Sequence, residues 1–160
     1  MPSTEQPVVV AYDGSDAARA AIEAAASLFA GRPLIVVSIW EAGLAQAMAP
    51  LRDPTGVGYP ISTPAEAAAI DEIQRDHAVR AAEEGAGLAR ELGARAEPLS
   101  VADEVDVGET LAAIADEHDA AALVIGSRGL GRVKSSLFGS TSRELLRRTH
   151  RPVLVVRVPE

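Results

Sequence analysis

Short, continuous apolar runs alternate along this chain with longer stretches in which apolar and polar residues mix. Apolar runs of about four to eight residues, bounded by glycine, proline or polar residues, are typical of strands buried in a parallel sheet. Strands are therefore predicted over residues 7–12, 33–40, 95–101, 121–125 and 152–158. The third of these alternates instead of running apolar throughout, and Pro98 within it has no backbone N–H to donate, so this strand is expected at an edge of the sheet.

The intervening stretches repeat apolar residues every three or four positions, which predicts amphipathic helices. Ser15 and Asp106 are expected to cap the first and third helices, and Thr141 with Glu144 to form a capping box that opens the fourth. The second and longest helix is predicted over residues 65–92. The residues expected on its inner face are Ile70, Ile73, His77, Ala81, Leu88 and Leu92.

The alternation of strands and helices indicates the α/β class: a single domain over residues 1–160, with one doubly wound, open, parallel five-stranded sheet and helices on both faces. Right-handed crossovers then favour the strand order 3-2-1-4-5. Residues 41–64 carry several prolines and no clear periodicity. They are predicted to form a long flexible loop, as either a lid or an interaction arm.

The strongest functional signal is the sequence GSRGLGRVKSSLFGSTS, which follows the fourth predicted strand. A strand, a glycine-rich loop and a helix can bind phosphate, because glycine allows close approach and the free N–H groups at a helix start favour an anion. The spacing G-x2-G-x9-G-[ST] matches neither a Walker A loop nor the GxGxxG loop of a Rossmann fold. The residues expected to contact a nucleotide here are Gly126, Arg128, Gly129, Gly139, Ser140, Thr141 and Ser142.

Asp13 ends the first predicted strand, and Gly126 ends the fourth. In the order 3-2-1-4-5 these two strands are neighbours at the topological switch point, where doubly wound sheets bind their ligands. Asp13 is placed there to bind a ribose hydroxyl or a Mg²⁺ ion held by nucleotide phosphates. An equally good interpretation is that Asp13 only caps the following helix.

The chain resembles the universal stress protein family in the segments that carry these signals: VVVAYDGS at 8–15, VIGSRGL at 124–130, Gly139-Ser140, and RPVLVVR at 151–157. The resemblance extends over residues 8–158. It implies the adenine nucleotide alpha hydrolase-like fold and, because the glycine pattern is intact, the ATP-binding branch, with ATP or another adenine nucleotide as ligand. It also implies backbone contacts to adenine near Ile39, and it places Ala11, Tyr12 and Ile125 beside the base and sugar.

Composition restricts the possible partners. The chain has no cysteine, which excludes disulfides and thiolate metal sites. No apolar run approaches the roughly 20 residues of a membrane span, and the first residues do not resemble a signal peptide, so a cytoplasmic protein with no membrane contact is expected. The net charge of −8 argues against a nucleic-acid binder. Residues 126–157, however, hold eight basic residues and one acidic residue, which suits a small polyanion.

The sequence contains no GxSxG elbow and no HxGH motif, and Asp13-Gly-Ser-Asp16 resembles the SGGxDS motif only loosely. His77 and His118 lie on predicted apolar helix faces and are expected to be packed or half-buried. Without a general base, any ATP hydrolysis is expected to be slow. The interpretation is therefore an ATP-binding regulatory module of the stress response. Three alternatives stay open: a member selective for AMP or cyclic AMP, a nucleotide-independent dimeric scaffold, and a true ATPase or transferase that uses Asp13.

The last predicted strand is apolar, has no interior charge and ends the sheet. An uncovered edge of this kind favours pairing with another strand. A two-fold homodimer through residues 153–157 is therefore predicted, and the family resemblance implies the same.

Overall fold

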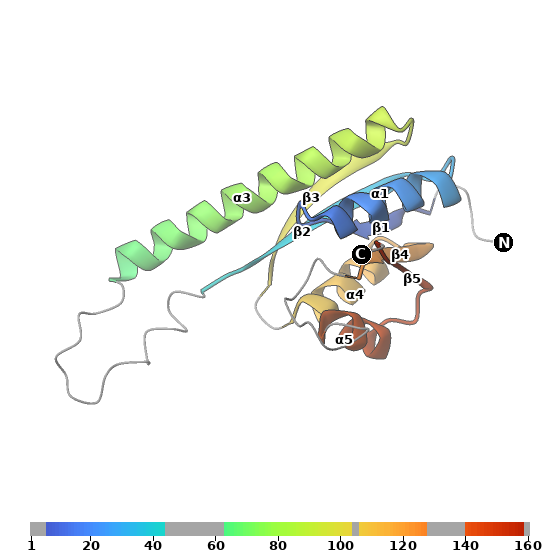
Figure 1. Ribbon diagram of the computed structural model, residues 1–160. Helices are drawn as coiled ribbons and strands as arrows, with labels where there is room; N and C mark the ends of the chain where they lie inside the picture. Colours follow the sequence, from blue (N-terminus) through green and yellow to red (C-terminus); the bar gives the residue numbers. More distant parts are fainter. Residues whose placement is uncertain (1–5, 44–62, 104–105, 128–139, 159–160) are drawn as a thin grey trace.

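Figure 1 shows the computed structural model, which describes residues 6–43, 63–103, 106–127 and 140–158. Its elements are β1 (Val8–Ala11), α1 (Asp16–Leu28), β2 (Leu34–Glu41), α3 (Pro64–Glu91), β3 (Ala96–Asp103), α4 (Val107–Glu117), β4 (Ala122–Gly126), α5 (Ser140–Arg148) and β5 (Val153–Val156). All the predicted strands and helices are present, with bounds that differ by a few residues. None of the helices in the described segments combines the length and the apolar character that crossing a bilayer requires.

The five strands are parallel and lie in the order β3-β2-β1-β4-β5, which confirms the predicted fold class and strand order. β1 is central, with Val8 beside Leu34 of β2 on one side and Ala122 of β4 on the other. β3, which contains Pro98, is an edge strand. Because β1 and β4 are neighbours in space but distant in sequence, their carboxyl ends meet at the switch point of the sheet.

Helices cover both faces of this sheet, α1 and α3 on one face and α4 and α5 on the other (Figure 1). Successive residues of a strand point to opposite faces, so β1 contributes to both cores. Val8 and Val10 pack with the α1/α3 side, while Val9 and Ala11 pack with the α4/α5 side. β1 is therefore buried throughout, and a ligand can reach it only at its ends.

The first and third predicted helix caps are confirmed. The Ser15 Oγ accepts a hydrogen bond from the N–H of Ala18 at 3.2 Å, and the Asp106 Oδ1 accepts one from the N–H of Gly108 at 2.8 Å. Each side chain thus satisfies an N–H group that lacks a partner within its helix. These caps fix where α1 and α4 begin, and both beginnings lie at the carboxyl end of the sheet.

The predicted capping box at the fourth helix is wrong. α5 begins at Ser140, so Thr141 lies within the first helical turn and does not precede it. A capping box does occur at the start of α3, where the Thr63 Oγ1 accepts from the N–H of Glu66 at 3.2 Å and the Glu66 carboxylate accepts from the N–H of Thr63. The sequence pattern T-x-x-E is the same in both places, but only at α3 does a threonine stand just before the helix.

The predicted 41–64 loop is shorter at both ends, because Glu41 belongs to β2 and Pro64 begins α3. Residues 44–62, on which the prediction of a lid or arm falls, lie outside the described residues. Just before them, the N–H of Gly43 donates to both carboxylate oxygens of Asp71, at 3.1 and 3.2 Å. This contact holds the chain that leaves β2 against the amino-terminal half of α3.

The predicted inner face of α3 is wrong for most of its members. Ile70, Ile73 and Leu92 are exposed, with 38%, 66% and 53% of their surfaces accessible, and of the predicted residues only Ala81 is buried. The buried residues of α3 are small: Ala67, Ala78, Ala81, Ala82, Gly85, Ala86 and Ala89. Small side chains let the helix approach the sheet closely; a Cβ on Gly85 would lie 2.7 Å from a methyl carbon of Val36.

Candidate functional site

The loop after β1 carries the first candidate residue. Asp13 is exposed, and its Oδ1 accepts a hydrogen bond from the N–H of Ser15 at 3.0 Å. Gly14 turns the chain with a φ of 81°, a conformation that favours glycine. Asp13 therefore organises the turn into α1 while its carboxylate stays accessible, so the two interpretations of this residue, turn former and ligand-binding group, are compatible.

Gly126, the last residue of β4, lies against the first turn of α1. A Cβ on Gly126 would lie 2.5 Å from both the carbonyl carbon and the carbonyl oxygen of Ala17, a separation that no side chain tolerates. The sequence analysis assigned Gly126 to close approach of a nucleotide, but the close approach seen here is to the backbone of α1. The glycine brings the start of α1 and the Asp13 turn beside the end of β4.

The residues expected beside the base and sugar divide between the two faces of the sheet. Ala11, Ile39 and Ile125 all pack on the face covered by α4 and α5. Tyr12 packs in the core on the opposite face, is 2% exposed, and its hydroxyl donates a hydrogen bond to the Glu84 Oε1 at 2.7 Å. Three of the four side chains therefore share one face, while the Tyr12 side chain points away from it.

The Tyr12 hydroxyl anchors the end of β1 to two helices. Burial, followed by the hydrogen bond to the Glu84 carboxylate and its negative charge, raises the pKa of Tyr12 to about 12. Arg19 of α1 pairs with the same Glu84 oxygen. Tyr12 thus stays a neutral donor at physiological pH and joins β1, α1 and α3 directly before the Asp13 turn.

The helix that follows the glycine-rich segment begins at Ser140. Thr141 and Ser142, in its first turn, are buried, each with 6% of its surface exposed. The N–H groups of a first helical turn have no acceptor within the helix, so this end of α5 favours an anion. The remaining candidate residues of the segment, Arg128, Gly129 and Gly139, lie outside the described residues.

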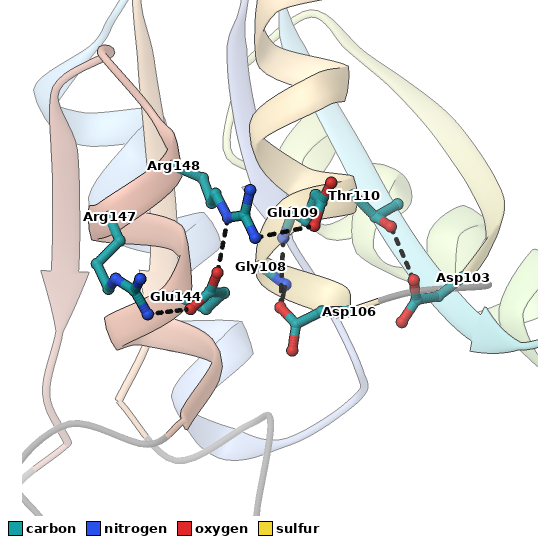
Figure 2. Close-up of polar contacts among 8 residues, drawn as sticks. All are labelled: Asp103, Asp106, Gly108, Glu109, Thr110, Glu144, Arg147 and Arg148. Carbon is teal, nitrogen blue, oxygen red and sulfur yellow. Dashed lines mark hydrogen bonds and ion pairs between the residues drawn. The ribbon is translucent and has the colours of Figure 1, made fainter.

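Figure 2 shows the polar contacts between α4 and α5. A Cβ on Gly108, in the first turn of α4, would lie 2.9 Å from the carbonyl oxygen of Thr141, so the two helices approach closely here. The Arg148 guanidinium then bridges the helices: it donates to Glu144 at 2.7 Å and pairs with Glu109 at 3.5 Å (Figure 2). The sequence analysis missed Gly108, although a glycine in the first turn of a predicted helix is a signal of such close packing.

None of the three histidines lies near the Asp13 turn. All three histidines are exposed, which corrects the prediction that His77 and His118 are packed. His118 caps the end of α4 and His150 precedes β5, so both lie at the amino end of the sheet, opposite Asp13. Among the described residues, no group of three or more His, Asp or Glu side chains is placed to hold a metal ion. A cation bound by Asp13 would need its other ligands from elsewhere, such as a phosphate group.

Known proteins share this architecture over nearly the full chain. The model of the universal stress protein family matches residues 5–157. The structure of a protein from this family from Burkholderia pseudomallei aligns with a TM-score of 0.68, at 24% identity over 98% of each chain. The universal stress protein from Archaeoglobus fulgidus in complex with dAMP aligns with a TM-score of 0.61, at 26% identity over 96% of this chain and 99% of that one.

A third structure, a universal stress protein in complex with cAMP, aligns with a TM-score of 0.62, at 25% identity over 97% of this chain and 98% of that chain. No curated protein matches the sequence significantly. Two of these three structures thus hold an adenine nucleotide.

Proposed function

The chain belongs to the universal stress protein family, and from this premise we propose that it binds an adenine nucleotide at the carboxyl ends of β1 and β4. One observation carries the proposal. The exposed Asp13 carboxylate lies at the carboxyl end of the sheet, where β1 and β4 end side by side. Two relatives at 25% and 26% identity were crystallised with cAMP and dAMP, which supports an adenine nucleotide as ligand.

The base and sugar lie against the strand ends that carry Ala11, Ile39 and Ile125, while the phosphates lie at the start of α5. In this arrangement Ser140, Thr141 and Ser142 contribute N–H and O–H donors to the phosphate oxygens. Tyr12 acts from the opposite face of the sheet, where it anchors the strand end.

ATP is the proposed nucleotide, because the spacing G-x2-G-x9-G-[ST] is intact and combines glycines with a hydroxyl residue, which suits phosphate binding. Arg128, Gly129 and Gly139 belong to this segment of the sequence. Asp13 then holds a Mg²⁺ ion that the phosphates also bind, since a carboxylate with phosphate oxygens is a set of ligands that Mg²⁺ prefers. A member selective for AMP or cyclic AMP is the second candidate, favoured by the monophosphates in the similar structures.

The protein acts as a regulatory binding module of the stress response and hydrolyses ATP slowly at most. His118 and His150 lie at the far end of the sheet and the Tyr12 hydroxyl is held neutral, so none of these three groups supplies a general base beside the nucleotide. Binding itself is then the functional event. The cytoplasm, where ATP is abundant, is the compartment that suits this role.

The module works as a homodimer through residues 153–157. β5 is paired with β4 along one edge, and its four apolar residues, Val153–Val156, are only partly buried. Pairing of two β5 strands across a two-fold axis would satisfy the free edge and bury these side chains. The mass of the protein in solution tests this part of the proposal separately from nucleotide binding.

Two variants of Ser140 test where the phosphates bind. Glutamate at the first position of a helix stabilises the helix, because its charge opposes the positive end of the dipole, yet it repels a phosphate group. Ser140→Glu is therefore expected to fold and to weaken ATP binding by at least tenfold, while Ser140→Gln, of nearly the same size, leaves most of the affinity.

Calorimetric titration with adenosine, AMP and ATP separates the base from the phosphates. The loss in Ser140→Glu is expected to grow with the number of phosphates and to leave adenosine unaffected. Equal affinities of Ser140→Glu and Ser140→Gln for ATP would place the phosphates elsewhere.

A further inference from the structure

One side of β3 is paired with β2, and its other side is an edge of the sheet, next to α3 (Figure 1). Along a strand, the N–H and C=O of one residue point to one side and those of the next residue to the other. The carbonyls of Arg95 and Asp103 accept hydrogen bonds from the N–H groups of Leu34 and Ala42, at 2.8 and 3.1 Å. The odd-numbered residues of β3 therefore bond to β2. The even-numbered residues direct their backbone groups outwards: Ala96, Pro98, Ser100 and Ala102.

Arg90 and Pro98 interrupt this outward row of donors and acceptors. Arg90, in the last turn of α3, donates from its Nε and Nη2 to the carbonyl oxygen of Ala96, at 3.0 and 2.8 Å. Pro98 has no N–H to donate. The C=O of Ala96 and the N–H position of Pro98 are consecutive in the row, so in a parallel pairing both would serve the same residue of an added strand. That residue would bury an N–H and a C=O without partners, which is unfavourable.

The opposite edge of the sheet, on β5, lacks such an interruption. The carbonyls of Pro152 and Val156 accept from the N–H groups of β4 and of the residue that follows it, both at 2.8 Å. The outward residues of β5 are therefore Val153 and Val155, and neither is a proline. No hydrogen bond from the part of the chain that the structure describes reaches their outward backbone groups. The two edges thus differ: the row of donors and acceptors is continuous on β5 and broken on β3.

We propose that Arg90 and Pro98 close the β3 edge to strand addition, so that an extended segment of any protein can lengthen this sheet at β5 and not at β3. An edge with a full row of free N–H and C=O groups favours aggregation, and blocking the row prevents it. The outward residues that remain, Ser100 and Ala102, belong to a stretch at the lower limit of strand length. The proposal concerns β3 alone and holds whether or not β5 pairs with a second copy.

The double variant Arg90→Met/Pro98→Val opens the edge. Methionine keeps the helix propensity of arginine but has no N–H donors, and valine suits a strand and restores the missing N–H. The matched control is Arg80→Met, because Arg80 is exposed on the same helix and its loss removes the same charge. Analytical ultracentrifugation is expected to show heavier species at high concentration for the double variant than for the wild type or the control. Identical distributions for all three proteins would overturn the proposal.

Amide hydrogen exchange at Ser100 and Ala102 shows whether the association uses β3. In the double variant these outward amides are expected to exchange at least about threefold more slowly at 1 mM than at 10 µM, because a paired N–H is protected. In the wild type they are expected to exchange fast at both concentrations. Local damage to the fold would speed exchange at both concentrations, so it cannot mimic this result. Protected Ser100 and Ala102 amides in the wild type, or exchange in the double variant that does not depend on concentration, would overturn the proposal.

Discussion

Gly126 and Ala17 approach so closely that a Cβ on the glycine would lie 2.5 Å from the carbonyl carbon of the alanine. The glycine that begins the proposed nucleotide motif is thus also the residue that lets α1 start beside the end of β4. Loss of nucleotide binding on substitution of Gly126 would therefore not by itself identify a nucleotide contact, which is why the Ser140 variants carry that test.

Gly126→Ala is expected to lower the free energy of unfolding by about 1–3 kcal/mol, because the added methyl group overlaps the α1 backbone. Urea denaturation measures the change. The double variant Ala17→Gly/Gly126→Ala provides the control: its stability should stay low, since the closest atoms are the backbone carbon and oxygen of residue 17. Recovery of wild-type stability in the double variant would contradict this explanation.

Two glycines of α3, two residues apart, are expected to respond in opposite directions. A Cβ on Gly85 would lie 2.7 Å from Val36 and 2.9 Å from the ring of Tyr12, whereas a Cβ on Gly87 would meet nothing within 4 Å. Gly85→Ala should therefore destabilise the protein by about 1–3 kcal/mol. Gly87→Ala should stabilise it by about 0.5–1 kcal/mol through helix propensity. Thermal and urea unfolding measure both, and changes of the same sign would contradict the packing of α3.

The Tyr12 hydroxyl is expected to ionise near pH 12 in the folded protein. Tyr59→Phe leaves Tyr12 as the sole tyrosine, so absorbance at 295 nm follows this one group. Because burial and the Glu84 carboxylate raise the pKa of Tyr12 above its ordinary value of 10, the native state holds the proton more tightly than the unfolded state. The stability that this provides is present below pH 10 and is lost as the pH rises towards 12. A midpoint near 10 in folded protein would contradict the contact with Glu84.

Asp13→Asn separates the two roles of Asp13. Asparagine keeps an oxygen that can accept from the N–H of Ser15, so the turn and the free energy of unfolding should change by less than about 0.5 kcal/mol. The negative charge is removed, so the gain in ATP affinity on adding Mg²⁺ should largely disappear. Calorimetric titrations with and without Mg²⁺ measure this gain; an unchanged gain would exclude Asp13 as a cation ligand.

The sheet was predictable from the sequence because its strands are buried on both faces and therefore appear as continuous apolar runs. The positions of those runs, with the rule of right-handed crossovers, lead to the order 3-2-1-4-5 that the structure confirms. Pro98 identified β3 as an edge strand, because proline has no N–H to donate to a neighbouring strand. The helix caps Ser15 and Asp106 were also predictable, because each bonds only to N–H groups in the first turn of its own helix.

The packed face of α3 was not predictable from hydropathy. Ile70 and Ile73 are more apolar than alanine, but they lie about a third of a turn around α3 from its buried alanines and stay exposed. Close packing of α3 on β2 requires small residues, such as Gly85 and the alanines. A hydropathy pattern gives these residues little weight, because they are less apolar than isoleucine or leucine. Thr141 does not cap α5, because the helix begins one residue earlier, at Ser140.

The nucleotide content of freshly purified protein tests the central claim most directly. Nucleotides are released by acid, separated by ion-exchange chromatography and identified, from the wild type and from Ser140→Glu in parallel. We expect ATP, or another adenine nucleotide, from the wild type and much less from the variant. A wild type that carries none, and that takes up no added ATP, AMP or cyclic AMP, would contradict the account and favour a nucleotide-independent scaffold.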